Sequence, residues 1–102
     1  MGYHVIWLDE AIDDLRRAVS HIAKDNPMAA RRTGERIFKQ VKVLVQFPRF
    51  GRVFPKLGRE DVREIPVPPY RVIYHVHDPD RTVNILTVWH GARQEPEPLP
   101  GL

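Results

Sequence analysis

The 102-residue sequence contains no cysteine. This absence excludes disulfide bonds and thiolate chemistry, so redox roles can be set aside, and it suits a reducing compartment. No stretch approaches the run of about 20 apolar residues that a membrane-spanning helix needs. The N-terminus also lacks the basic region followed by an apolar region that marks a secretion signal. We therefore expect a soluble cytoplasmic protein with no membrane association.

Hydrophobic residues make up 42% of the chain, which is enough to bury one modest core at this length. We expect a single domain over residues 1–93. Residues 94–102 carry three prolines and are predicted to form a disordered tail.

The net charge of +3 is spread unevenly along the chain. Residues 49–75 carry six Lys or Arg against three Asp or Glu, whereas residues 76–102 carry two against four. A local excess of cations favours anionic partners, such as nucleic acid or an acidic protein segment. On composition alone, ordinary solvated charges explain the same pattern equally well.

The first half of the chain is predicted to form a strand and a helical hairpin. Tyr3 to Leu8 is short and rich in β-branched and aromatic residues, as strands are. Apolar residues then recur at helical spacing until about Asp25, and Asn26-Pro27 is a typical start for a second helix. This second helix should turn Ile37, Val41 and Leu44 toward the sheet and end at Phe47-Pro48.

The second half is predicted to form a basic loop over residues 48–61 and three strands. The strands are Val62–Val67, Tyr70–His77 and Thr82–His90, and turn residues separate the last two. The resulting fold class is α+β, with the order β-α-α-β-β-β. We expect an antiparallel sheet with the helical hairpin packed on one face, which leaves the other face partly open to partners.

Five motifs of the sequence resemble the RelE/ParE superfamily of toxins from type II toxin–antitoxin systems. In chain order they are Val5-Ile6-Trp7-Leu8-Asp9-Glu10-Ala11, Asn26-Pro27-Met28-Ala29-Ala30-Arg31-Arg32, Phe47-Pro48-Arg49-Phe50-Gly51-Arg52, Tyr70-Arg71-Val72-Ile73-Tyr74 and Val88-Trp89-His90-Gly91-Ala92-Arg93. Together they cover nearly the whole chain. The Asn-Pro-x-Ala-Ala junction and the His-Gly-Ala-Arg ending look most like ParE.

The resemblance implies a toxin that a partly disordered antitoxin of the ParD or RelB kind neutralises, in a toxin–antitoxin hetero-oligomer. ParE-like members inhibit DNA gyrase without being known as nucleases, whereas RelE-like members cut mRNA in the ribosomal A site. A gyrase inhibitor is therefore the leading hypothesis and a ribosome-dependent endoribonuclease the alternative. A third possibility is a degenerate toxin that only binds its antitoxin or DNA.

If the protein is a nuclease, Arg71 and His90 are the candidate catalytic residues. Arg71 matches the arginine of the Tyr-Arg-x-x-Tyr strand that the nuclease members use, and His90 could transfer a proton near neutral pH. A structural arginine and a structural histidine are the competing interpretations. The lysine-rich strand of the cutting members is missing, because only Lys56 lies in the central basic loop.

Two sets of basic residues are candidate contact surfaces. The second helix has a basic flank that we expect to pair with carboxylates of an antitoxin helix, through Arg31, Arg32 and Arg36. The target-binding candidates come mainly from the basic loop and are Arg52, Lys56, Arg59, Arg63 and Arg93.

No cofactor or metal is expected. The sequence has no Gly-rich nucleotide fingerprint. His75 and His77 share a face of their predicted strand, but no carboxylate or cysteine joins them and His90 at a familiar ligand spacing.

Overall fold

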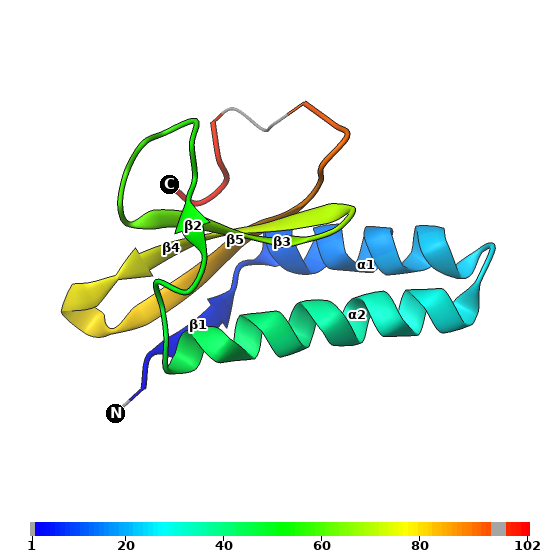
Figure 1. Ribbon diagram of the computed structural model, residues 1–102, viewed down its shortest axis with the longest axis horizontal. Coiled ribbons are helices and arrows are strands. Elements are labelled where there is room, and N and C mark those ends of the chain that lie inside the picture. Colours follow the sequence, from blue (N-terminus) through cyan, green and yellow to red (C-terminus); the bar gives the residue numbers. More distant parts are fainter. Residues whose placement is uncertain (1, 95–97) are drawn as a thin grey trace.

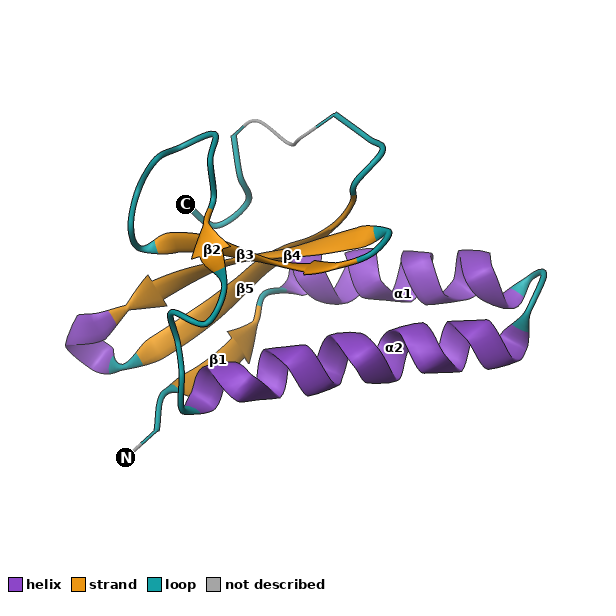
Figure 2. Cartoon of the chain, in the orientation of Figure 1, coloured by secondary structure: helices purple, strands orange, loops and turns teal. Residues whose placement is uncertain are grey.

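The computed structural model describes residues 2–94 and 98–102. Within these residues, a hairpin of two α-helices packs on one face of a five-stranded sheet (Figures 1 and 2). The elements in chain order are β1 (His4–Trp7), α1 (Asp9–Ala23), α2 (Pro27–Lys42), the 3-10 turn η1 (Val43–Val45), β2 (Arg52–Val53), β3 (Val62–Val67), β4 (Tyr70–His77), the 3-10 turn η2 (Asp78–Asp80) and β5 (Thr82–His90).

The junction between the helices forms as its sequence predicts. The side-chain oxygen of Asn26 accepts a hydrogen bond from the Ala29 amide at 3.0 Å, and Pro27 occupies the first turn, where no amide donor is needed. The two helices then run antiparallel along the sheet. In the part of the chain that the structure describes, no helix has the length and apolar character to cross a membrane.

The sheet has the order β1-β5-β4-β3-β2 and is mixed. The pairs within β2 to β5 are antiparallel, as expected, but β1 pairs with β5 in parallel. Parallel neighbours need a long connection, and here the helical hairpin and three strands supply it. The sequence also gave no signal for β2, because this strand has only two residues and lies inside the basic loop.

The main hydrophobic core lies between the helices and the sheet. Ile37, Val41 and Leu44 are at most 3% exposed, which confirms the predicted phase of the second helix. The sheet contributes alternate residues of its central strands to this core, among them Val72, Tyr74 and Val76 of β4. Packing against the helices therefore fixes the positions of β3, β4 and β5, the strands that carry Arg63, Arg71 and His90.

The other face of the sheet carries a second, smaller core. Phe54 of the basic loop packs there with Ile73, Leu86 and Leu99, all at most 7% exposed. This face is therefore less open than expected. Leu99, from the segment predicted as a tail, is buried in this smaller core, while residues 95–97 of that segment lie outside the described residues.

Gly51 fixes the base of the basic loop against β4. The Gly51 amide donates a hydrogen bond to the Tyr74 hydroxyl oxygen at 2.9 Å. A Cβ atom at position 51 would lie 2.6 Å from the Glu64 carbonyl oxygen and 2.7 Å from the Tyr74 hydroxyl oxygen. Only glycine allows so close an approach, and it brings Arg52 beside β3.

Candidate functional site

Arg71 is held by a buried carboxylate. Glu64 of β3 has a fully buried side chain, and its two carboxylate oxygens accept hydrogen bonds from Arg52 at 2.7 Å and Arg71 at 3.1 Å. The Arg71 side chain is 20% exposed, and its guanidinium lies over the ring of Phe54. A buried carboxylate needs such partners. Arg71 is therefore held in place as a partner of Glu64, and its candidate role in catalysis stays a prediction.

The sheet separates Arg71 from His90. Arg71 pairs with Trp89 on the face of the smaller core, whereas His90 pairs with Tyr70 on the face that carries the helices. The His90 ring meets the Tyr70 ring edge-on, with 5.2 Å between the centroids. The two candidate catalytic residues thus lie on opposite faces of the sheet and do not form one site.

A hydrogen-bonded turn at the end of β5 orients His90. The Ala92 amide donates to His90 Nδ1 at 3.1 Å, which leaves Nε2 to carry the ring proton of the neutral form. The Gly91 amide donates to the Pro69 carbonyl oxygen, and the Arg93 amide donates to the His90 carbonyl oxygen. The Trp89 indole donates to the Arg93 carbonyl oxygen at 3.2 Å. These bonds fix the turn over the adjacent cleft.

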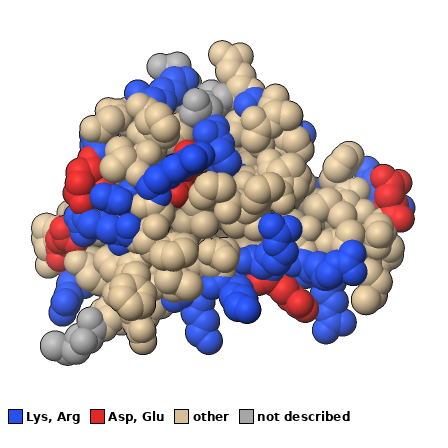
Figure 3. All heavy atoms as spheres, viewed as in Figure 1, with Lys and Arg blue, Asp and Glu red and all other residues tan. Residues whose placement is uncertain are grey.

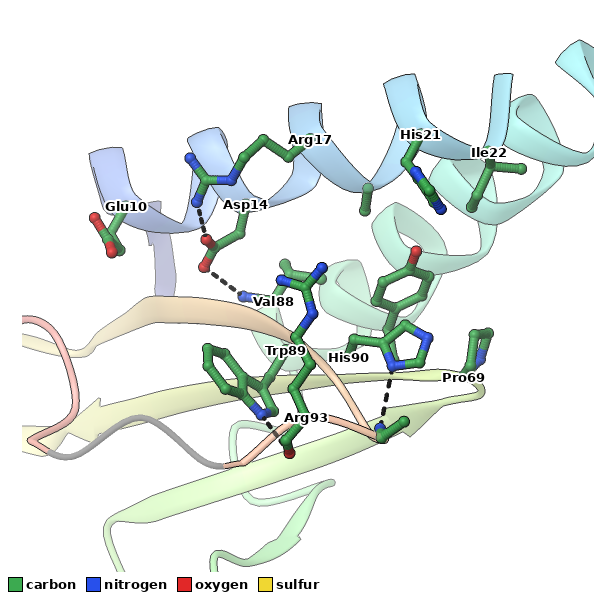
Figure 4. Close-up of a pocket in the computed structure, with 13 residues that line it drawn as sticks. Glu10, Asp14, Arg17, His21, Ile22, Pro69, Val88, Trp89, His90 and Arg93 are labelled. Carbon is green, nitrogen blue, oxygen red and sulfur yellow. Dashed lines mark hydrogen bonds and ion pairs between the residues drawn. The ribbon is translucent and has the colours of Figure 1, made fainter. Parts of the chain in front are cut away.

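That cleft lies between α1 and the end of β5 and has a volume of about 740 Å³ (Figure 4). Arg93 reaches across it from the strand side, and His21 points toward it from α1. At the edge of the cleft, the Asp14 carboxylate accepts hydrogen bonds from Arg17, from the Thr87 hydroxyl and from the Val88 amide, the last at 3.2 Å. These bonds fasten α1 to β5 and compensate the charge of Asp14.

The target-binding candidates are only partly brought together. Arg52 and Arg59 are more than half exposed, although each has a carboxylate partner, in Glu64 and Asp61 respectively. Lys56 is exposed in the same loop. Arg63 is only 15% exposed, and it donates to the carbonyl oxygens of Glu60, Arg49 and Gly51, so these bonds hold the loop together. Arg93 lies apart, in the cleft beside α1.

An ion-pair network ties the basic loop to the β4–β5 turn. Arg49 bridges Glu60 and Asp78, and the Tyr3 hydroxyl also donates to Asp78, at 2.6 Å. Hydrogen bonds from Arg49, and then from Tyr3, lower the pKa of the Asp78 carboxyl to about 2. The pKa of Asp61 is also lowered to about 2, chiefly by Arg59 and less by His75. Both carboxylates therefore stay charged far below neutral pH and hold the loop in place.

The antitoxin-binding candidates lie together on α2. Arg31, Arg32 and Arg36 are all exposed, and Arg31 forms an ion pair with Glu35 one turn away at 3.1 Å. Lys and Arg side chains gather over α2 on the face shown in Figure 3. A surface of this kind attracts acidic partners.

His75 and His77 lie near one end of β4, whereas His90 pairs with the other end, beside the cleft that His21 also lines. His75 binds Asp61 at 2.9 Å and His77 binds Asp80 at 2.8 Å. Among the described residues, no three His, Cys, Asp or Glu side chains gather in a way that could hold a metal ion.

Two residues of this region gave no signal in the sequence. Glu64 follows an arginine within a strand and looks like an ordinary solvated charge, and only the register of β3 with β2 and β4 shows that it is buried between two arginines. His21 is one polar residue on the outer part of a helix, and its position at the cleft depends on the packing of α1 on β5.

Comparison with known proteins relates the chain to bacterial toxins. Residues 5–95 match the model of the family described as the ParE toxin of the type II toxin–antitoxin system, parDE. The toxin RelE2 of Caulobacter vibrioides is 34% identical over 87% of this chain and 96% of its own length. Among solved structures, the chromosomal ParDE system of P. aeruginosa matches with a TM-score of 0.69 and 23% identity, over 86% of this chain and 95% of that one. The isolated RelE toxin of E. coli matches with a TM-score of 0.66 and 21% identity, over 91% of this chain and 88% of that one.

Proposed function

The chain belongs to the ParE toxin family of type II toxin–antitoxin systems, and we propose that it acts in the cytoplasm by binding and inhibiting DNA gyrase. A cognate antitoxin neutralises it, as the pairing of toxin with antitoxin in the similar ParDE system suggests. The exposed arginines of α2 and the basic loop provide separate surfaces for the two partners.

The observation that carries this proposal is the separation of Arg71 from His90. Cleavage of RNA needs a base, an acid and a cation around one phosphate. In this chain, Arg71 forms an ion pair with buried Glu64 on one face of the sheet, and His90 lies on the other face. This arrangement supports a toxin that works by binding, for which no catalytic group is needed.

The alternative, a ribosome-dependent mRNA endoribonuclease, is favoured by one observation. Two imidazoles and two guanidiniums, from His21, His90, Arg17 and Arg93, line the same cleft. Imidazole and guanidinium are the groups that can move a proton and stabilise a phosphate during cleavage. The same cleft could therefore serve nuclease chemistry without Arg71.

Growth inhibition by three variants separates the two functions. Neutralising Arg52, Lys56 and Arg59 together with glutamine should relieve toxicity, because these exposed cations belong to the proposed target surface. His90→Ala and Arg71→Lys should leave most of the toxicity intact. Arg71→Lys keeps a positive charge beside the buried Glu64 carboxylate. The variant therefore tests whether toxicity needs the guanidinium group itself, without removing the charge partner of Glu64.

The matched readout is growth after induction, with the amount of folded protein measured for each variant. A nuclease would lose rate by roughly 10²–10⁴-fold when His90 is removed. Full relief of toxicity by His90→Ala, with the triple variant still toxic, would contradict inhibition by binding through the loop.

A further inference from the structure

The chain leaves η1 through a tight turn that presents two aromatic side chains to solvent. The Phe50 amide donates a hydrogen bond to the Phe47 carbonyl oxygen at 3.0 Å, which closes a β-turn over residues 47–50. Pro48 occupies the second position, where its fixed φ angle favours the turn. Phe47 is 62% exposed and Phe50 is 54% exposed. This Phe47–Phe50 turn lies at the end of α2 that is farther from the α1–α2 junction (Figure 1).

Ion pairs and hydrogen bonds from η2, β3 and the far end of the basic loop hold this turn. Arg49, its third residue, forms ion pairs with Glu60 and with Asp78, the latter at 2.9 Å. Arg63 donates hydrogen bonds to the carbonyl oxygens of Arg49, at 3.3 Å, and of Gly51, at 2.9 Å. The backbone that carries the two phenylalanines is therefore fixed before any partner binds.

Two exposed phenyl rings on one fixed turn indicate a binding surface. Single apolar side chains are common on protein surfaces, but apolar side chains gathered in one place mark interaction sites. Because the backbone is already in position, a partner that covers these rings loses little conformational entropy on binding. Buried aromatic anchors supply much of the free energy of a protein interface.

An apolar hollow of about 350 Å³ lies beside the turn. Val43 and Val45 of η1 line it together with Phe47. Lys39 and Lys42 of α2 line it too, and neither forms an ion pair with any residue that the structure describes. The surface next to the turn therefore combines apolar side chains with two cations that are available to a partner's carboxylates.

We propose that the Phe47–Phe50 turn and this hollow form the anchor by which the toxin binds its protein target. The two rings enter an apolar pocket of the target, and carboxylates at the rim of that pocket meet Lys39 and Lys42. The proposal rests on the proposed function in taking the target to be gyrase. It adds an apolar anchor to the cations of the basic loop, which begins with this turn.

A strand of nucleic acid fits this surface less well than a protein does. Nucleic-acid sites need cations that are free to neutralise phosphates. Arg49, Arg52 and Arg59 each form an ion pair with a carboxylate of the chain. Glu60 and Asp78, which are more than half exposed beside the turn, would also repel phosphates.

Supercoiling by purified gyrase, with the whole toxin chain added, tests this proposal. The double variant Phe47→Ser with Phe50→Ser should raise the toxin concentration needed for half-inhibition by at least about tenfold, because it removes both anchors. The variant Phe47→Leu with Phe50→Leu keeps apolar side chains and should recover most of the inhibition. Because both rings are exposed, the serine variant should keep the parent's melting temperature and its affinity for the cognate antitoxin.

Two control variants are matched to the proposed anchor. Met28→Ser removes a side chain that is 62% exposed, like Phe47, from the other end of α2, and it should leave the inhibition at the parent's level. Lys42→Glu should weaken inhibition by at least about fivefold, and more at low salt. Lys24→Glu, which reverses a charge at the end of α1 instead, should have a much smaller effect.

Several results would overturn the proposal. Inhibition that the serine variant leaves unchanged, or that Met28→Ser reduces equally, would show that the rings are not an anchor. The serine substitutions might instead abolish antitoxin binding, self-association of the parent, or binding of an oligothymidylate, and each of these results would assign the rings to another partner.

Growth inhibition separates this proposal from the proposed function. A parent toxin that leaves supercoiling normal refutes gyrase as the target. Relief of growth inhibition by the serine variant, with Met28→Ser still toxic, would then support the same anchor on another protein target. Undiminished toxicity of the serine variant would overturn the anchor as well.

Discussion

Leu44→Ala should destabilise the protein by about 2–5 kcal/mol. Leu44 is fully buried in the main core, where η1 follows α2 and packs against the sheet. The substitution removes apolar contacts and leaves a cavity that close-packed neighbours fill only in part. Because small domains have only about 5–15 kcal/mol of total stability, this is a large share.

The measurement is unfolding by urea or heat, with Phe47→Ala as the control. Phe47 lies three residues further along and is 62% exposed, so its loss should change stability by only about 0.5 kcal/mol or less. The melting temperature of Leu44→Ala should fall by roughly 10 °C or more. A melting temperature equal to that of the parent would show that α2 and η1 are packed in a different rotation.

Glu64→Gln should cost about 2–4 kcal/mol of stability. The carboxylate is fully buried and accepts hydrogen bonds from Arg52 and Arg71. Glutamine keeps the volume but loses the charge, so the ion pairs that Glu64 forms with Arg52 and Arg71 are both lost. We place the cost below that of a fully buried pair because Arg52 is 61% exposed and water can solvate it.

Two further variants show whether the cost comes from the buried charge. Glu35→Gln removes a carboxylate from a surface pair on α2, and it should change stability by less than about 1 kcal/mol. Combining Glu64→Gln with Arg71→Gln should cost less than the sum of the single changes, because both changes remove the same ion pair. Additive costs in this double-mutant cycle would mean that Glu64 and Arg71 are not coupled.

Local sequence signals were enough for the helices and for the order of the main strands. Asn26-Pro27 marks the start of α2 because capping depends on neighbouring residues only, and the three- and four-residue spacing of Ile37, Val41 and Leu44 identifies the buried face. The antiparallel hairpin of β4 and β5 follows from turn residues between two β-branched runs. The family match agrees with the resemblance that these motifs carry.

Features that depend on long-range pairing could not be predicted in this way. The parallel pairing of β1 with β5 joins strands about 80 residues apart, and no local pattern encodes its direction. The burial of Phe54 and Leu99 on the second face depends on where a loop and the tail return to the sheet. For the candidate site, strand alternation could not show that buried Glu64 holds Arg71 or that His90 faces α1.

A supercoiling assay with purified gyrase, run beside primer extension on mRNA from translating ribosomes, tests the central claim most directly. If the toxin acts by binding gyrase, it should inhibit supercoiling and leave the mRNA intact, and the antitoxin should reverse the inhibition. Codon-positioned mRNA breaks that disappear with His90→Ala, together with normal supercoiling, would contradict the proposed function and identify the protein as a ribosome-dependent nuclease.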